Sequence, residues 1–555
     1  MDILILIIIA SGFLLAGYFL YGRFLRKLLN LSATAKTPAH TLRDDVDFVP
    51  TAKVYLLGQH FSAIAAAGPI VGPVLAGIWF GWVPTILWIV FGGIFIGGVH
   101  DLVTLVASVK HEGKSIAEVI KANISRHAFI LFLFFLWFSI IYIITTFTDI
   151  TAGTFIDPIR GPGVASSSMM YLGLALVMGI TLKIFKMPLF VSTLIFLPLV
   201  FLCIYLGPVF PLSIPPLLGG DLRITWDILL LIYCFFASVI PVWLVLQPRG
   251  YLGGFFLTCT VLVSFIGIIV GSFTQNYLIH YPAFTKWVNP AGLPLLPVLF
   301  TTVACGACSG FHALVSSGTT SKQISKETDA MAIGYGGMLL ESFVAIIALA
   351  TLLLLTSSQA QKLGDPNQIY ANGIASFLSA LGINRELALN FALLAFATFV
   401  YDTLDVATRL GRYIFQELTG WRTGASSIIA ALATLILPVI FVTKKTTDAA
   451  GNVIPAWKVF WTLFGSSNQL LAGMVLFGLS VWLYKRKMKY LTTLLPSFLM
   501  IIIALTSLYF ILGPLITDIV LKGKFNQGPL LFTGLTLLLL AGLLIIEGAR
   551  QFKKH

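Results

Sequence analysis

The stretch "GQHFSAIAAAGPIVGP", residues 58–73, interrupts a long apolar segment and places His60 beside the interruption. Its glycines let the backbone leave helical dihedrals, and its prolines each remove a backbone hydrogen-bond donor. In hydrocarbon the freed backbone groups would cost several kcal/mol each, so such a break must face protein or a water-filled cavity. A kink that only improves helix packing is the alternative. The glycines and prolines concerned are Gly68, Pro69, Gly72 and Pro73.

Composition places this stretch in a membrane protein. Of the 555 residues, 58% are hydrophobic and only 10% are charged, whereas soluble domains carry about 25% charged residues. Apolar runs of roughly 20 residues recur along the whole chain, and each could cross a bilayer core about 30 Å thick. Membrane β-barrels show short alternating segments instead. We therefore predict an all-α integral membrane protein with about 15 transmembrane helices.

The net charge of +13 reflects how the chain is oriented in the membrane. Most of the 35 Lys and Arg residues fall in alternate loops between the expected spans, and the positive-inside rule makes those loops cytoplasmic. We expect the N-terminus outside, the C-terminus in the cytoplasm and a place in the cell (inner) membrane. The first span lacks a basic leader and a cleavage site, so it is expected to be retained. The lipid bilayer explains this charge pattern, and no nucleic-acid partner is expected.

A second interruption lies in "PVLFTTVACGACSGFHALVSSGTTSKQ", residues 297–323. Each break is followed by a helix with an acidic residue behind a glycine pair, Asp101 in the first case and Glu341 in the second. The two Gly-x-His units, which end at His60 and His312, fall out of that register. By the expected spans, the breaks at 55–80 and 293–319 are seven helices apart, which gives them opposite orientations.

That arrangement predicts an inverted-topology repeat, in which substrate sites lie at discontinuous helices near the membrane midplane. We expect residues 1–54 to form a first transmembrane helix and a cytoplasmic loop. Residues 55–273 would form the first repeat, and residues 293–549 the second repeat with the C-terminal helices. Five-plus-five and seven-plus-seven repeats both stay open.

Ionisable groups at membrane depth are functional candidates because burying them there is costly. Histidines near carboxylates can exchange protons in the physiological pH range, and the hydroxyl-rich "SSGTTS" after His312 could ligate Na⁺ or cap a helix end. We expect the substrate to contact His60, Gly68, Pro69, Gly72, Pro73, Cys305, Gly306, Ser309, Gly310, His312, Ser316 and Ser317. We expect ion coupling to involve Asp101, Asp149, Glu341, Asp405, Thr319, Thr320, Ser466 and Asn468.

Alternatives remain for several of these groups. Asp101 and Asp149 could be solvated near span ends, and Asp405 could form a local i, i+4 ion pair with Arg409. Cys305 and Cys308 are spaced like a redox or metal pair but lack a second ligand pair. No cofactor and no metal site are expected, and the coupling ion would be a proton or Na⁺.

Four stretches together resemble the signature segments of the carbon starvation protein A (CstA) family: "GQHFSAIAAAGPIVGPVLA", "ACGACSGFHALVSSGTTSK", "YDTLDVATRLGRYIFQEL" and "LFGSSNQLLAGM". They occur in order between residues 58 and 474. The resemblance implies uptake of small nutrients, peptides or pyruvate, with proton symport, through the inner membrane during carbon limitation. It also implies a fold like that of the amino-acid/polyamine/organocation transporters. The chain departs from many members in being shorter.

The residues and the resemblance together predict a secondary symporter, not an enzyme, for a small carboxylate such as pyruvate or for short peptides. Alternating access would be driven by an ion gradient. A passive channel or facilitator is the first alternative, and a membrane-embedded sensor or redox protein the second. A homo-oligomer is compatible with the sequence.

Overall fold

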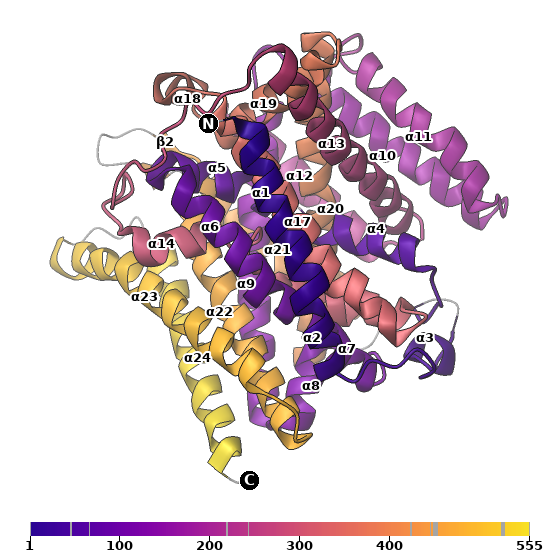
Figure 1. The fold of residues 1–555 in the computed structure, drawn as a ribbon, viewed down its shortest axis with the longest axis vertical. Helices are drawn as coiled ribbons and strands as arrows, with labels where there is room; N and C mark the ends of the chain where they lie inside the picture. The colour runs from indigo at the N-terminus through magenta and orange to yellow at the C-terminus, as the bar shows by residue number, and fades with distance from the viewer. Residues whose placement is uncertain are drawn as a thin grey trace. The chain divides into compact units, whose positions relative to one another are not determined.

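The computed structural model describes residues 2–44, 47–65, 67–217, 220–241, 243–421, 424–444, 446–447, 453–522 and 528–553. These residues are almost entirely helical (Figure 1). The chain divides into two compact units, and each is described by itself. Unit 1 comprises Met1–Leu6, Ile140–Tyr281 and Ile347–Val459; unit 2 comprises Ile7–Ser139, Pro282–Ile346 and Phe460–His555.

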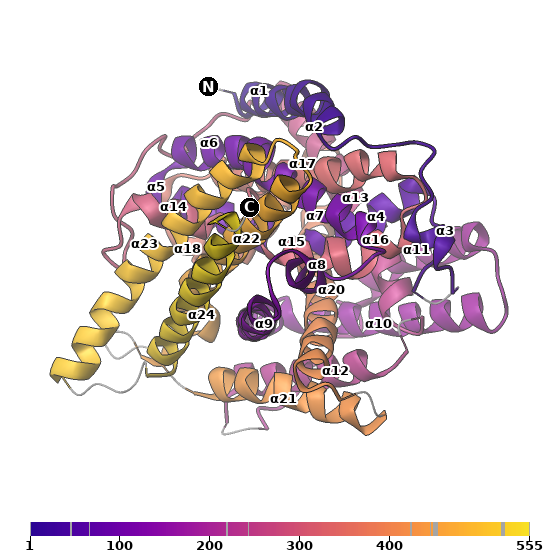
Figure 2. The ribbon, with the colours of Figure 1, turned by 90° about the horizontal axis from the view of Figure 1, so that it is seen from below.

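Unit 2 contains both broken segments and the C-terminal helices. In Figures 1 and 2, the C-terminal helices α23 and α24 (yellow) lie side by side. The elements of unit 2 are η1 (Gly17–Tyr21), α2 (Gly22–Leu28), α3 (Pro38–Thr41), α4 (Lys53–Ile64), α5 (Gly68–Phe80), α6 (Trp82–Gly92), η2 (Gly93–Gly97), α7 (Gly98–Lys110), α8 (Ile116–Asn123), α14 (Leu295–Thr302), α15 (Phe311–Val315), η3 (Ser316–Thr320), α16 (Ser321–Gln323), η4 (Glu327–Asp329), η5 (Met331–Tyr335), α23 (Leu491–Lys522) and α24 (Gly528–Lys553).

Unit 1 is built around α20, which packs against α10, α11, α12, α13, α19 and α21. Its elements are α10 (Gly161–Lys183), α11 (Leu189–Leu206), α12 (Leu222–Val239), α13 (Leu246–Thr274), α18 (Ser357–Leu363), α19 (Pro366–Ala380), α20 (Arg385–Thr419), α21 (Gly424–Thr443) and the antiparallel pair β1 (Thr446–Thr447) and β2 (Val453–Ile454). Four helices belong to both units: α1 (Ile3–Ala16), α9 (Arg126–Phe155), α17 (Gly336–Leu353) and α22 (Ala456–Lys485).

The all-helical membrane architecture is confirmed, whereas the expected number of spans is not. Among the described residues, 13 helices are long and apolar enough to cross a membrane, or up to 14 if the bent pair α4 and α5 forms one span. The span expected over residues 293–319 is not one helix, because α14 ends at Thr302 and α15 begins only at Phe311. The second predicted break is therefore present.

The first break lies slightly before its predicted position. Helix α4 ends at Ile64 and α5 begins at Gly68, with a bend of 47° between them. Pro69 sits in the first turn of α5, and Pro73 lies inside that helix. Placing the break within residues 68–73 was therefore wrong. A proline is favoured in the first turn, where its missing N–H has no helical partner to lose.

The two broken segments run antiparallel beside each other. His60 hydrogen-bonds Thr320, and a Cβ added to Gly68 would meet Cys305. Farther along, a Cβ at Gly72 would lie 2.5 Å from the carbonyl oxygen of Thr302. As the numbers rise along the first segment they fall along the second, which is the orientation that an inverted repeat requires.

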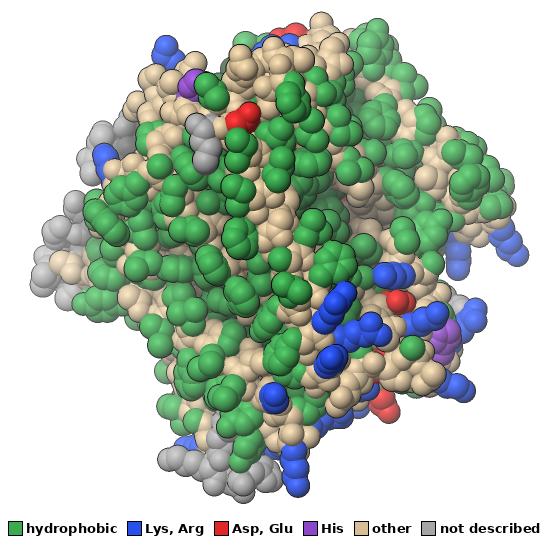
Figure 3. Space-filling view, viewed as in Figure 1, with side chains coloured by type: hydrophobic (Ala, Val, Ile, Leu, Met, Phe, Trp, Pro, Cys, Tyr) green, Lys and Arg blue, Asp and Glu red, His purple; other side chains and the backbone are tan. Residues whose placement is uncertain are grey.

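Helix α1 presents an apolar surface that ends in basic side chains. The side chains of Ile8, Phe13 and Leu15 are each more than half exposed, as expected for contact with lipid. Figure 3 shows hydrophobic side chains along α1 and a group of Lys and Arg side chains where α2 lies. The sequence of α2, "GRFLRKL", contains three basic residues.

The close packing at the second break generates a first prediction. A Cβ added to Gly310 would lie 2.5 Å from Leu471 Cβ and 2.6 Å from the Asn468 carbonyl oxygen. Gly310→Ala is expected to destabilise the protein by about 1–3 kcal/mol, as overpacking does. Gly58→Ala is the matched control, because nothing lies within 4 Å of a Cβ there. Thermal unfolding in detergent measures both; a Gly310→Ala protein as stable as wild type would contradict the packing described.

Candidate functional site

The centre of unit 2 holds a buried imidazole between two carboxylates. His312 Nδ1 lies 2.8 Å from Asp101 Oδ2, and His312 Nε2 lies 3.1 Å from Glu341 Oε2. All three side chains are fully buried. Sequence analysis had selected these three residues separately, and the structure brings them into direct contact.

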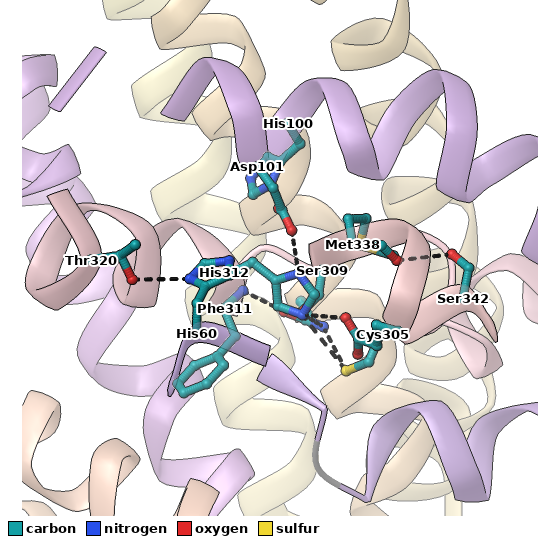
Figure 4. Close-up of polar contacts among 12 residues, drawn as sticks. His60, His100, Asp101, Cys305, Ser309, Phe311, His312, Thr320, Met338 and Ser342 are labelled. Atoms are coloured by element: carbon teal, nitrogen blue, oxygen red, sulfur yellow. Dashed lines mark hydrogen bonds and ion pairs between the residues drawn. The ribbon is translucent and has the colours of Figure 1, made fainter. Parts of the chain in front are cut away.

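Each member of this trio stands next to an irregularity in its helix. His312 follows the second break, in the first turn of α15. Asp101 follows the π-helical turn η2, and Glu341 follows the π-helical turn η5. Such turns rotate the residues beyond them relative to a regular helix and are frequent at functional sites. Figure 4 shows how Asp101 reaches down from α7 towards the ring of His312.

Two further histidines complete the cluster, which we call the imidazole–carboxylate cluster (His60, His100, Asp101, His312 and Glu341). His100 Nδ1 lies 2.7 Å from Asp101 Oδ1, so both oxygens of this carboxylate face an imidazole. His60 Nδ1 lies 2.9 Å from Thr320 Oγ1 (Figure 4). His60 also interacts electrostatically with Asp101 and His312.

The cluster retains unused hydrogen-bonding capacity. Among the described residues, no hydrogen-bond partner exists for Glu341 Oε1, His60 Nε2 or His100 Nε2, and the 3.1 Å contact of His312 Nε2 with Glu341 Oε2 is an ion-pair contact without hydrogen-bond geometry. With both carboxylates ionised and one imidazole protonated, the cluster would carry one uncompensated negative charge, which is costly in a buried site. One further proton removes that charge. The geometry therefore suits a group of side chains that can take up and release a proton.

The second break is closed on one side by Asn468 of α22. Its side-chain oxygen accepts from the Phe311 amide at 3.0 Å, and its backbone oxygen accepts from the Gly310 amide at 3.2 Å. Its amide nitrogen donates to Ser309 Oγ at 3.0 Å. These bonds replace the helical partners that the break removes. Asn468, which was selected for ion coupling, thus also holds the broken backbone.

Neighbouring side chains satisfy the carbonyl groups at the end of α14. Gln469 Nε2 donates to the Phe300 oxygen at 3.1 Å, and Trp88 Nε1 donates to the Val303 oxygen at 3.2 Å. Ser466 bonds the Thr462 oxygen at 2.9 Å within its own helix. Sequence reasoning missed the roles of Gln469 and Trp88, although a polar residue beside a glycine in an apolar helix was a usable signal.

Some backbone donors at the break remain unused. Within the part of the chain that the structure describes, the amides of Ala304, Cys305 and Gly306 make no hydrogen bond. Three consecutive amides that are not consumed by a helix can bind an anion such as a carboxylate. The Cα of Gly306 is nevertheless tightly packed, since a Cβ there would lie 2.7 Å from Ala345 Cβ.

The hydroxyl residues after His312 have different surroundings. Ser316 is buried, and its Oγ has no partner among the described residues. Ser317 accepts from the Ile116 amide at 2.9 Å and so anchors the start of α8. Thr319 is exposed, and its hydroxyl donates to the Val315 carbonyl of its own turn at 3.1 Å. Among the described residues, Thr320 is the one of these four whose side chain hydrogen-bonds a side chain of the cluster, that of His60.

Two of the predicted coupling carboxylates lie in unit 1. Asp149 lies 2.5 Å from Arg223 Nε and accepts from the Trp457 amide at 2.7 Å, so it joins α9, α12 and the start of α22. Asp405 pairs with Arg249, and the Tyr233 hydroxyl donates to the same carboxylate at 2.8 Å. The structure thus does not place these two carboxylates in the imidazole–carboxylate cluster.

Arg249 is the charged residue that sequence analysis overlooked. Helix α13 begins at Leu246 and buries the guanidinium between Asp405 and Asp402, whose Oδ1 lies 3.3 Å from Arg249 Nε. The alternative of a local pair between Asp405 and Arg409 was wrong. Arg409 Nη2 instead donates to the carbonyl oxygens of Ala237 and Ile240, at 2.6 Å each, and caps α12.

Broken antiparallel helices around a buried ionisable cluster are features of a multi-pass membrane transporter. The family model for "Carbon starvation protein CstA" matches residues 2–370 and 361–507. The chain therefore belongs to the carbon starvation protein CstA family.

Relatives are named as transporters. The chain is 33% identical over 545 residues to "Peptide transporter CstA" of Bacillus subtilis (strain 168), an alignment that covers 88% of this chain and 87% of the relative. It is 31% identical over 570 residues to "Pyruvate/proton symporter BtsT" of Escherichia coli (strain K12), with 87% and 77% covered. The protein is accordingly a membrane transporter, and no enzyme, for a small-molecule substrate.

Solved structures that resemble the chain are also transporters. The manganese transporter of Eremococcus coleocola, in complex with an aromatic bis-isothiourea compound, has 14% identity and a TM-score of 0.45, with 92% of this chain and 99% of that one covered. MhsT in complex with L-phenylalanine has 12% identity and a TM-score of 0.39, with 82% and 99% covered.

The burial of Arg249 generates a second prediction. Arg249→Ala would leave Asp402 and Asp405 buried without this guanidinium, and breaking a buried ion pair costs roughly 3–5 kcal/mol. Arg550→Ala is the control, because Arg550 is 67% exposed and lies 3.2 Å from Glu547 at the surface; such pairs contribute about 0–1 kcal/mol. Unfolding in detergent should show a large loss only for Arg249→Ala, and equal losses would contradict the assignment.

Proposed function

We propose that the protein is a proton-coupled symporter that imports a small carboxylate, such as pyruvate, by alternating access. The observation that carries this proposal is the position of His312 between Asp101 and Glu341 beside the second helix break. A site that gains and loses one proton at the place where two broken helices meet can link substrate binding to a proton gradient.

Proton coupling follows from the groups that the cluster contains. Imidazoles and carboxylates are the side chains that exchange protons most readily near neutral pH when they are close together. Glu341 has one carboxylate oxygen in contact with His312 and one without a partner among the described residues. Glu341 is thus the residue to which we assign the transported proton, with His312 as its exchange partner.

A carboxylate substrate fits the unused amides of Ala304, Cys305 and Gly306. The negative charge of the substrate would be held by these donors, while the proton on the cluster keeps the loaded site close to neutral. The packing of glycines against neighbouring helices at the breaks favours a small substrate. A relative named as a pyruvate/proton symporter supports this choice.

A short peptide is the second candidate, because several relatives carry the name peptide transporter. A peptide also has a carboxylate, so the same amides could receive it. The two candidates differ in size and in the amino group that only the peptide carries. We assign the protein to the cell (inner) membrane, with the N-terminus outside and the C-terminus in the cytoplasm, on the distribution of its basic residues.

Purified protein reconstituted in proteoliposomes tests the substrate. An inward proton gradient is expected to drive accumulation of labelled pyruvate above its external concentration, and collapse of the gradient by a protonophore should abolish it. Accumulation of di- or tripeptides without pyruvate transport would replace the first candidate by the second. Entry of pyruvate only down its own gradient, whatever the pH difference, would show a passive facilitator instead.

Glu341→Gln generates a third prediction. The amide is nearly the same size as the carboxyl group but cannot carry the proton, so gradient-driven accumulation should be lost while exchange of internal for external substrate persists. The control is Glu118→Gln, since Glu118 is a surface residue 3.0 Å from Lys121. A Glu341→Gln protein that still accumulates substrate would remove Glu341 from the coupling step.

A further inference from the structure

An ion pair outside the imidazole–carboxylate cluster joins α7 to the segment that leads from η4 into α17. Lys110, the last residue of α7, pairs with Glu327, the first residue of η4. Glu327 is 1% exposed and also accepts from the Ser32 amide at 2.8 Å. A buried carboxylate with these partners lies in the connection between the second broken segment and α17.

The chain that precedes the first broken segment is tied to this connection. The Thr51 amide donates to the Gln323 oxygen at 2.9 Å, and Ser325 Oγ donates to the Thr51 oxygen at 2.9 Å. Thr51 and Ile324 form an isolated parallel bridge. The start of α4 and the end of α16 are therefore held together at the end of unit 2 to which the Lys- and Arg-rich stretch 23–53 leads, which we call the basic end.

The attachment continues from this end towards the cluster. Helix α4 packs against η3 and α15, and His60 bonds Thr320 at the end of η3. These segments therefore extend from the cluster towards the basic end.

The ion pair and the cluster share their two supports. Helix α7 carries Asp101 near its start and Lys110 at its end. The segment from η4 to α17 carries Glu327 and Glu341. Asp101 reaches Glu341 through His312, whereas Lys110 reaches Glu327 directly. A shift of α7 relative to that segment changes both contacts together.

We propose that Glu327 is a positioning residue of the transport cycle, and that its ion pair with Lys110 holds the basic end of the path closed. This proposal rests on one part of the function proposed above, which is that the protein transports by alternating access. The Lys110 side chain is 29% exposed, so water reaches the pair and can take over its charges when it separates. Such a contact suits a gate that has to open in every cycle.

Native cysteines in the second break supply the readout. Cys305 and Cys308 are buried beside the cluster and should become reachable from the basic side when that end opens. The test uses the full chain with Cys203, Cys234 and Cys259 replaced by Ser or Ala, reconstituted in vesicles. A membrane-impermeant thiol reagent is applied on one side at a time, and the rate of modification is measured.

Glu327→Gln is expected to raise that rate about fivefold or more from the basic side and to leave it unchanged from the opposite side, since couplings of this kind typically shift an equilibrium 5–150-fold. Lys110→Gln should give the same increase, and the double variant should give no more than either single one, because both remove one interaction. Glu112→Gln is the matched control, as Glu112 lies at the same end of α7 with its side chain 71% exposed.

The proposal is overturned if Glu327→Gln labels like wild type, if it labels faster from both sides, or if the two single effects add in the double variant. Faster labelling from both sides would mean a general loosening, which a purely structural role predicts. Because labelling needs neither pyruvate nor a proton gradient, failure of wild-type uptake would overturn the proposed substrate or coupling and leave this test intact.

Discussion

The contact of His312 with Asp101 and Glu341 is the constraint on which the rest of unit 2 depends. Two carboxylates in a membrane interior cannot both stay ionised without a positive partner, because burial of an unpaired charge is costly. With only one of the imidazoles protonated, the site stays one charge short of neutrality. A further proton would remove this shortage, and in the proposed function that proton is the one exchanged in each cycle. The contacts of His312 also join α7, α15 and α17.

The broken helices impose a second requirement, because every interruption frees backbone groups that lipid cannot satisfy. At the second break Asn468, Gln469 and Trp88 take over most of these groups. What remains unused is a short run of amides next to the cluster. Structural hydrogen bonding therefore leaves a limited set of backbone donors at the break, and these are the donors that the proposed function assigns to the substrate.

Unit 1 shows a different use of buried charge. Arg249 lies between Asp402 and Asp405, and Arg409 caps the end of α12. In this group a permanent cation lies between the two carboxylates, and these contacts hold α12, α13 and α20 together. Buried carboxylates in one protein thus differ in role according to whether a permanent cation lies beside them.

Membrane class, helical structure, the two breaks and the family could all be predicted from sequence, because hydrophobic runs and Gly/Pro clusters act locally through the bilayer and the backbone. The selection of His60, Asp101, His312 and Glu341 also followed from one local fact, an ionisable side chain in an apolar run. Their partners could not be predicted. The Asp101–His312 contact joins residues 211 apart in the chain, and Glu327, Lys110 and Arg249 gain their meaning only from such distant contacts. Asn468 was selected for ion coupling, and the tertiary structure adds that it caps the break, because only the fold decides which buried polar group already has a partner.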